Sequence, residues 1–366
     1  MSVTRNIAIA GGGTGGHVNP ALAIADAYVQ QVGASPMFIG TAKGLEARLV
    51  PQRGYTLELV DGSRLVGGSL SAKIRGLVGL VRGVSQARKI LKKHGVKLVI
   101  GVGGYASGAA LLAARTLGLR TAIHESNAVP GFTNKVLGRL VDRVYLGFEA
   151  AAAAFPGDKV VVTGNPVRSE IETLDVSRAL PADPAPAQVL VVGGSQGALF
   201  LNENVPALLA AVRDRGVALK VRHQVGKLDA EPVEAAYAKA GVDAEVVKYI
   251  DDMAAAYRWA NFAVTRAGSG TVSELAAARL PALLVPFPYA AGDHQAANAR
   301  AFADAGAGFW QRQRDWNSEK LADRVASLMS DDGAMDRAVR GALAVARPDA
   351  ARAVVADCES MMEGRW

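Results

Sequence analysis

The chain repeats one pattern in its two halves: an apolar strand, a glycine-rich turn, a helix and a second apolar strand. In the first half, residues 6–10 lead into GGGTGGH, and a second strand begins at Met37, 27 residues after Ala10. In the second half, residues 188–192 lead into GGSQG, and the spacing from Val192 to Leu219 is the same. Strands this apolar are typical of parallel sheets that helices bury on both faces. The pattern predicts an α/β chain of two doubly wound, Rossmann-like domains facing a cleft, with ligands beyond the carboxyl ends of the strands.

The length of 366 residues fits two domains. The prediction is a first domain over residues 1–164 and a second over residues 165–349. The proline-rich segment 174–188 is expected to be a loop that follows the crossover. From Ser318 onward the pattern is helical, and we expect the last helix, about residues 350–366, to pack back on the first domain.

Cysteine content and hydropathy bear on the compartment. The single Cys358 cannot form an internal disulfide, so nothing indicates an oxidising compartment. The N-terminus lacks the pattern of a signal peptide, and the longest uncharged run, residues 98–114, is too short and too broken by glycine to span a membrane. We therefore expect a protein that is cytosolic or bound to a membrane face.

Charge divides the chain unevenly. Residues 1–163 carry 19 basic and 8 acidic side chains, residues 164–366 carry 22 and 26, and residues 62–124 contain eleven basic side chains and no acidic one. Such a split indicates an anionic partner for the first domain. Nucleic acid is disfavoured because Tyr105 is the only aromatic residue in the acid-free tract, which leaves no stacking platform.

One helical stripe within the acid-free tract combines apolar residues with basic flanks. It is either a core-facing stripe with solvated flanks or a surface that docks on anionic lipid. Its members are Leu70, Lys73, Ile74, Arg75, Leu77, Val78, Val81 and Arg82.

The first glycine loop, Gly11 to His17, follows a strand and opens a helix, which suits an anion. It also satisfies G-x-G-x-x-G, but a dinucleotide site needs an acid where the second strand ends, and Gly40 and Thr41 stand there. A nicotinamide site is therefore disfavoured. His17 lies at the helix start, where the dipole favours the neutral imidazole that a general base requires.

The GGSQG loop has two interpretations. It fits the G-x-S-x-G nucleophile elbow of a hydrolase, with Ser195 as nucleophile and His223 or His294 as base. Its equivalence to the first glycine loop favours instead a second turn that contacts a diphosphate. Both interpretations remain open at this point.

A third glycine turn, in TRAGSGTVSE, follows the apolar run 262–264. Its amide groups suit a phosphate, and Glu274, about one helical turn further, can accept both hydroxyls of a ribose. Together with GGSQG, this turn indicates a nucleoside diphosphate. The GGYASG and HESN clusters follow other strands and are expected to line the cleft. No cluster shows metal-ligand spacing, and we predict neither metal nor cofactor.

Eight motifs occur in an order that resembles the MurG family of peptidoglycan N-acetylglucosaminyltransferases. They are GGGTGGH, GGYASG, HESN, TGNPVR, GGSQG, YIDDM, RAGSGTVSE and DHQAANA. The resemblance covers nearly the whole chain and implies a GT-B fold. It implies that the second domain mainly holds UDP-N-acetylglucosamine, that the first takes the lipid-linked muramoyl-pentapeptide, and that the protein is peripheral on the cytoplasmic face of the bacterial inner membrane. It also allows partners among other cell-wall synthesis proteins.

The resemblance also assigns roles to individual residues. Those assigned to UDP-N-acetylglucosamine are Thr14, Gly15, Gly16, Asn127, Arg168, Ser195, Ile250, Gly268, Ser269, Gly270, Thr271, Glu274 and Gln295. Those expected in the acceptor cleft are Tyr105, Ser107 and Asn134. Ser126 departs from the family, which usually has Gln there.

The predicted reaction is an inverting transfer of N-acetylglucosamine to the muramoyl 4-hydroxyl of undecaprenyl-diphospho-muramoyl-pentapeptide. His17 is the expected general base and Glu125 the second choice. Glycine-turn amides and Arg168 are expected to stabilise the departing UDP. The alternatives are a related GT-B transferase acting on another lipid such as a diacylglycerol, a nucleotide-dependent membrane adaptor and a serine hydrolase.

Overall fold

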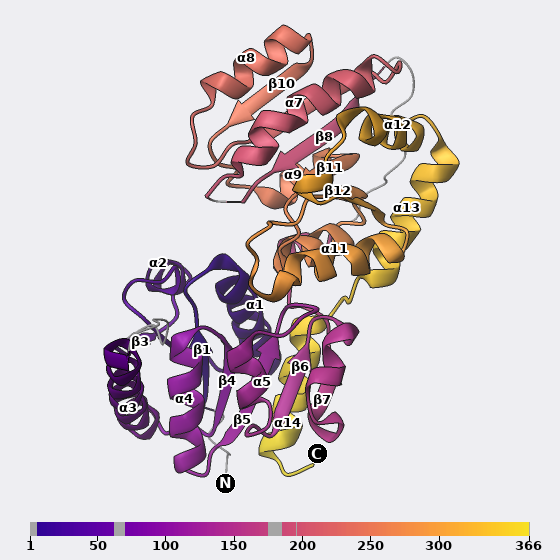
Figure 1. Ribbon diagram of the computed structural model, residues 1–366. Helices are drawn as coiled ribbons and strands as arrows, with labels where there is room; N and C mark the ends of the chain where they lie inside the picture. The colour runs from indigo at the N-terminus through magenta and orange to yellow at the C-terminus, as the bar shows by residue number, and fades with distance from the viewer. Residues whose placement is uncertain (1–5, 62–69, 175–184, 195, 366) are drawn as a thin grey trace. The chain divides into compact units, whose positions relative to one another are not determined.

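A computed structural model describes residues 6–61, 70–174, 185–194 and 196–365; the side chains of residues 70–75 are not described. The chain divides into two compact units (Figure 1). The first comprises residues 1–168 together with residues 349–366, and the second comprises residues 169–348. The predicted first domain ends at Gly164, and most of the predicted proline-rich loop lies outside the described residues.

The first unit contains a seven-stranded parallel sheet in the order β3-β2-β1-β4-β5-β6-β7. Its strands are β1 (Ile7–Gly11), β2 (Met37–Gly40), β3 (Leu57–Leu59), β4 (Leu98–Gly103), β5 (Arg120–Glu125), β6 (Arg143–Leu146) and β7 (Val160–Val162). Every residue of β1 and β4 is buried, as expected for strands covered on both faces.

Helices cover both faces of this sheet. They are α1 (Gly15–Val32), α2 (Glu46–Gln52), α3 (Leu70–Lys93), α4 (Tyr105–Thr116), α5 (Phe132–Leu137) and α14 (Ala350–Met362), with 3-10 turns at Glu149–Ala154 and Gly157–Lys159. One buried apolar cluster joins α1 and α14 to the strands, and a second joins α3, α4 and α5 to them. The C-terminal helix, yellow in Figure 1, thus belongs to the first unit.

The second unit has a six-stranded parallel sheet in the order β10-β9-β8-β11-β12-β13. Its strands are β8 (Ala187–Val192), β9 (Leu219–Gln224), β10 (Asp243–Val247), β11 (Phe262–Thr265), β12 (Ala282–Leu284) and β13 (Gly308–Trp310). The four strands predicted in the two glycine-loop repeats all form within one to three residues of their predicted bounds.

The helices of the second unit include the predicted closing helices. They are α6 (Ser169–Glu172), α7 (Leu199–Arg213), α8 (Glu231–Ala240), α9 (Met253–Trp259), α10 (Ser269–Ala277), α11 (His294–Asp304), α12 (Ser318–Met329) and α13 (Asp332–Val345), with 3-10 turns at Ala291–Asp293 and Gln313–Asp315. The main apolar cluster joins α7, α8 and α12 to the sheet. In both units, strand order reverses beside the first strand, which is where doubly wound sheets bind ligands.

Candidate functional site

Two glycine loops meet at the carboxyl ends of β1 and β4. The Gly12 amide donates to the Gly103 carbonyl over 3.2 Å. Gly11, Gly12 and Gly13 all have positive φ, and a Cβ on Gly104 would lie 2.9 Å from the Gly12 oxygen. The close approach of the two loops therefore requires glycine on both sides.

His17, in the first turn of α1, lies against both loops. Its Nδ1 is 3.0 Å from the Gly12 carbonyl oxygen. A carbonyl only accepts, so Nδ1 carries the hydrogen and Nε2 of the neutral ring carries the lone pair. Nε2 faces Gly103, where a Cβ would come within 2.7 Å of it. Any side chain at residue 103 would therefore collide with the basic nitrogen, and glycine avoids this.

Glu46, at the start of α2, is a site residue that the sequence did not reveal. Its carboxylate is 2% exposed and accepts from the Gly13 amide (2.7 Å), the Thr41 amide (3.0 Å) and the Thr41 hydroxyl (2.9 Å). A Cβ on Gly12 or Gly44 would overlap this carboxyl group. The search for an acid where the second strand ends missed it because Glu46 stands six residues beyond Gly40 and reaches back to the glycine loop.

Glu125, the second candidate base, ends β5 and is 2% exposed. One oxygen accepts from the amide of Asn127 (2.9 Å) and from its side chain (3.1 Å), and the other from the Gly131 amide (3.1 Å) and from Asn134 Nδ2 (2.9 Å). Four donors therefore occupy this carboxylate, and it joins the loop after β5, which carries Asn127, to α5, which carries Asn134.

The neighbouring motif residues form a buried polar network. His124 Nε2 lies 3.3 Å from the Gly164 carbonyl and Nδ1 lies 3.3 Å from Ser126 Oγ, while Asn165 Nδ2 donates to the Ser126 carbonyl over 2.9 Å. Burial lowers the pKa of His124 to about 4, so this imidazole stays neutral. The network explains why HESN and TGNP occur together: it binds the loop after β5 to the segment after β7.

The two GGYASG side chains expected in the acceptor cleft, Tyr105 and Ser107, pack against neighbouring elements of the first unit. Ser107 is fully buried against Gly101. The Tyr105 hydroxyl lies against Gly83 of α3, about 3.1 Å from where a Cβ would stand. The third expected residue, Asn134, is 6% exposed and bound to Glu125, as described above.

The second glycine loop packs against the carboxyl end of β9. Gly194 and Gly197 have positive φ, and a Cβ on Gly226 would overlap the Gly197 backbone. Ser195 itself lies outside the described residues. The two histidines considered as the base of a hydrolase are each bonded to other groups. His223 is buried between Tyr237 (3.0 Å) and Asn202 (3.2 Å), and His294 donates to the Ala291 carbonyl (2.8 Å).

The start of α10 combines two features expected of a nucleotide site. Gly268 is extended (φ −62°, ψ 142°), and no side chain caps the helix, so its first amide groups point toward the space before Ser269. Glu274 accepts a hydrogen bond from the hydroxyl of Tyr257 on α9 over 3.0 Å. Tyr257, which is 1% exposed, was not identified from the sequence because it lies in a separate, unremarkable helical segment.

Two loops of the second unit carry the remaining donor candidates. Gln295 is the second residue of α11 and accepts from the Phe287 amide over 2.9 Å, which holds it to the loop after β12. Asp293, which precedes it, pairs with Arg312 at 2.6 Å, and this partner lowers the pKa of Asp293. Ile250 is half-buried before α9, where Asp252 caps the helix by accepting from the Ala255 amide (2.8 Å).

The described part of the basic-flanked stripe on α3 faces solvent. Leu77, Val78 and Val81 are 60–64% exposed, whereas the glycines Gly76 and Gly83 are buried on the packed side of the helix. Arg82 pairs with Asp61 at 2.8 Å. Leu70, Lys73, Ile74 and Arg75 belong to residues whose side chains are not described. The core-facing interpretation is therefore wrong for the described apolar members.

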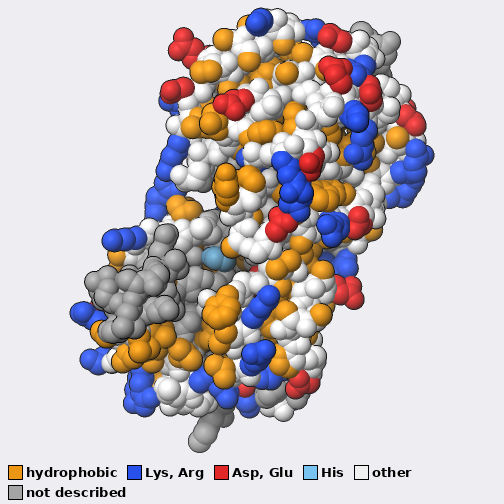
Figure 2. Space-filling view, in the orientation of Figure 1, with side chains coloured by type: hydrophobic (Ala, Val, Ile, Leu, Met, Phe, Trp, Pro, Cys, Tyr) orange, Lys and Arg blue, Asp and Glu red, His pale blue; other side chains and the backbone are white. Residues whose placement is uncertain are grey.

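A second exposed apolar stripe begins on α5 and had not been predicted. Phe132 is 82% exposed, and Val136 and Leu140 are each 44% exposed, with Lys135 and Arg139 between them. Figure 2 shows apolar side chains gathered over α3, α4 and α5 on one face of the first unit. No helix of the described residues is long and apolar enough to cross a membrane, and those residues contain no cluster of three metal-ligating side chains.

Comparison with known proteins supports the family resemblance that the motifs indicated. Residues 7–146 match the N-terminal domain of glycosyltransferase family 28, and residues 188–352 match its C-terminal domain. A relative from Geobacter sulfurreducens is 40% identical over 349 residues, 95% of this chain and 96% of its own. It is named UDP-N-acetylglucosamine–N-acetylmuramyl-(pentapeptide) pyrophosphoryl-undecaprenol N-acetylglucosamine transferase. A relative of the same name from Acidithiobacillus ferrooxidans is 45% identical over 354 residues, 96% of this chain and 97% of its own.

Solved structures match over nearly the full length. MurG of Acinetobacter baumannii matches with a TM-score of 0.81 at 34% identity, covering 98% of this chain and 100% of its own. MnaA of S. aureus, solved with UDP, matches with a TM-score of 0.69 at 14% identity, covering 98% of this chain and 97% of its own, and shares the fold. The predicted fold of two Rossmann-like domains of GT-B type is confirmed.

Proposed function

The chain belongs to glycosyltransferase family 28, and on that premise we propose that it transfers N-acetylglucosamine from UDP-N-acetylglucosamine to undecaprenyl-diphospho-muramoyl-pentapeptide. The attacking group is the muramoyl 4-hydroxyl, and UDP leaves. The observation that carries this proposal is the start of α10 in the second unit, where uncapped amide groups suit a diphosphate and Glu274 follows one turn later. In the first unit, the bond from His17 Nδ1 to the Gly12 carbonyl leaves the lone pair on Nε2.

His17 is the proposed general base. As the hydroxyl oxygen attacks the anomeric carbon, its proton passes to Nε2, and the bond to the UDP oxygen breaks with its electron pair. Base catalysis of this kind contributes about 10²–10⁴ in rate. Nδ1 remains bonded to the Gly12 carbonyl throughout, so the ring keeps its orientation. Glu125 is a weaker candidate because four donors already occupy its oxygens.

Donor binding is proposed for the second unit. The uncapped amides of Ser269, Gly270 and Thr271 suit the diphosphate, and Glu274, oriented by Tyr257, suits the ribose hydroxyls. We assign Ile250 to the uracil, Gln295 to the sugar hydroxyls and Ser195 to the diphosphate. Arg168, the residue before the second unit begins, is also assigned to the diphosphate. Amide donors and a guanidinium stabilise a leaving diphosphate electrostatically, so the proposal includes no metal ion.

Membrane binding is proposed for the first unit. The exposed stripe on α3 and the stripe on α5 would enter the lipid interface, while their lysines and arginines meet anionic headgroups. This would place the protein on the cytoplasmic face of the inner membrane, next to a lipid-linked acceptor.

Acceptor comparison tests the proposal. UDP release is followed with UDP-N-acetylglucosamine and either the lipid-linked muramoyl-pentapeptide or a diacylglycerol in the same detergent. We expect release with the first acceptor alone, and an unchanged rate in the presence of a metal chelator. Release with the diacylglycerol alone would identify a transferase of another lipid, and tight UDP binding without release would indicate a membrane adaptor.

A further inference from the structure

We propose that Glu46 is a positioning residue for His17 and acts through the peptide group that joins Gly12 to Gly13. The inference rests on the proposed role of His17 as general base. It concerns a buried carboxylate that neither contacts His17 directly nor lies where a substrate would reach it.

Glu46 and His17 each form a hydrogen bond to the same peptide group. The Gly13 N–H donates to Glu46 Oε2 over 2.7 Å, and the Gly12 C=O accepts from His17 Nδ1 over 3.0 Å. This nitrogen and this oxygen belong to the same planar unit, so the carboxylate and the imidazole are bonded to its opposite ends. A chain thus runs from the carboxylate through N–H and C=O to the ring nitrogen.

The surroundings fix the carboxylate in place. Its second oxygen accepts from the amide and the hydroxyl of Thr41, and the side chain is 2% exposed. Side chains at Gly12, Gly40 or Gly44 would crowd into it. Five residues at the ends of β1 and β2 therefore surround the Glu46 carboxyl group: Gly12, Gly13, Gly40, Thr41 and Gly44. Glu46 is thus a buried part of this structure and not a surface acid.

The chemical consequence is a choice of tautomer. Hydrogen bonds in a chain polarise one another, so a carboxylate on the N–H makes the carbonyl at the other end a better acceptor. A better acceptor at Gly12 favours the neutral ring with hydrogen on Nδ1, and it stabilises the imidazolium that forms when Nε2 takes the proton of the acceptor hydroxyl. No proton crosses the peptide.

The opposite tautomer would be inactive as a base. With hydrogen on Nε2, the nitrogen beside Gly103 would be a donor and unable to accept the hydroxyl proton. Where a carboxylate orients a catalytic histidine by direct contact, changing it to an amide lowers kcat about 10⁴-fold through the wrong tautomer. An effect that passes through one peptide group is weaker than direct contact, and we expect Glu46→Gln to lower kcat about tenfold.

The test reads the tautomer directly. Long-range ¹H–¹⁵N spectra of the full-length, ¹⁵N-labelled protein distinguish the two neutral forms of His17, which is assigned by its loss in His17→Ala. We expect the Nδ1–H form in the wild type and a growing Nε2–H population in Glu46→Gln, which cannot accept from both Gly13 and Thr41 as the carboxylate does. Thr41→Val is the matched control: it removes one bond to Glu46 but keeps the charge and the bond to Gly13, so the tautomer should not change.

Kinetics provide a second readout that a purely structural role would not give. Glu46→Gln should lower kcat about tenfold at an unchanged donor KM, and should cost nothing further in the His17→Ala background. An equal loss in both backgrounds would overturn the inference, as would a wild-type Nε2–H tautomer or an unchanged tautomer in folded Glu46→Gln. If Glu46→Gln does not fold, the tautomer of His17 in the wild-type protein tests the inference: the Nδ1–H form supports it and the Nε2–H form overturns it. If His17→Ala keeps full turnover, the proposed base is wrong, while the spectra still decide the role of Glu46.

Discussion

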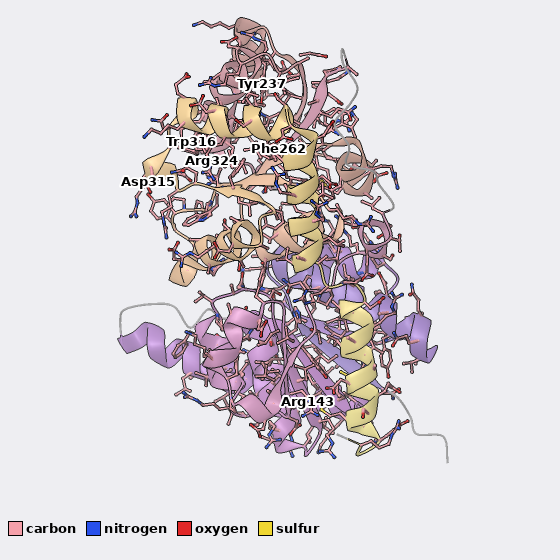
Figure 3. All side chains as sticks on the ribbon, turned by 90° about the vertical axis from the view of Figure 1, so that its right-hand side faces the viewer. Arg143, Tyr237, Phe262, Asp315, Trp316 and Arg324 are labelled. Atoms are coloured by element: carbon pink, nitrogen blue, oxygen red, sulfur yellow. The ribbon has the colours of Figure 1, made fainter. Side chains whose placement is uncertain are left out.

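Tyr145 on β6 donates a hydrogen bond to Asp357 on α14 over 2.9 Å, although 212 residues separate them along the chain. Arg143 donates to the same carboxylate oxygen over 3.1 Å, and Figure 3 shows it beside the C-terminal helix. Cys358, fully buried, lies 3.3 Å from the Tyr145 hydroxyl. This polar contact fastens the last helix to the sheet of the first unit, in addition to the apolar packing of α14 against α1.

Asp357→Ala should loosen that helix, because it removes the carboxylate that accepts from both the buried Tyr145 hydroxyl and Arg143. Such bonds to a charged group contribute about 1.5–3 kcal/mol each. Burial raises the pKa of Cys358 to about 12, so the native thiol should resist maleimide at pH 8, and the variant should react much faster. Asp336→Ala, which breaks an exposed pair with Arg340, is the control and should leave the labelling rate unchanged. Equal labelling of all three proteins would refute the role of Asp357.

Glu274→Ala should weaken donor binding. Loss of a charge-assisted contact to ribose costs about 1.5–3 kcal/mol, a rise in donor KM of roughly tenfold to a hundredfold. Tyr257→Phe removes only the hydroxyl that orients Glu274 and should raise the donor KM less, in the same direction. An unchanged donor KM in Glu274→Ala would remove this residue from the site.

The apolar positions on α3 should govern the part of membrane binding that salt does not remove. Replacing Leu77, Val78 and Val81 by Ser should abolish sedimentation with anionic vesicles at high salt, whereas Lys73, Arg75 and Arg82 to Glu should abolish the salt-sensitive part, about 1 kcal/mol per residue. Leu199→Ser and Leu343→Ser, at similarly exposed positions of the second unit, are controls. If the controls weaken binding as much as the α3 changes, docking does not depend on α3.

How far the sequence predicted the molecule depends on the range of the interactions involved. Strands such as residues 188–192 were predictable because hydrophobic runs and glycine turns are local signals. Glu46 and Tyr257 were not, because the contacts that bring them to the site are with Gly13, 33 residues away, and with Glu274, 17 residues away. Only the fold brings these residues together. The α3 stripe was ambiguous since its periodicity is the same for a buried and an exposed face, and the buried glycines resolve it.

Acid should destabilise the second unit through His223. Burial lowers its pKa to about 4, while the unfolded chain takes up a proton near 6.5. Below pH 6.5 the unfolded state binds more protons, so stability falls as the pH drops toward 4, by about 2 kcal/mol at pH 5. Urea unfolding followed by the fluorescence of Trp259, Trp310 and Trp316 should show this loss between pH 7.5 and pH 5. In His223→Gln the loss should shrink, and an identical pH dependence in the two proteins would contradict this origin.

Transfer of radiolabelled N-acetylglucosamine from its UDP donor to the lipid-linked muramoyl-pentapeptide tests the central claim most directly, with the product extracted into organic solvent. We expect the wild type to move label into the organic phase as a β-linked disaccharide, since a single displacement inverts the donor's α configuration. His17→Ala should bind UDP normally and lose turnover by a factor of about 10²–10⁴. Label that stays in the aqueous phase with the wild type, or an α-linked product, would contradict the claim.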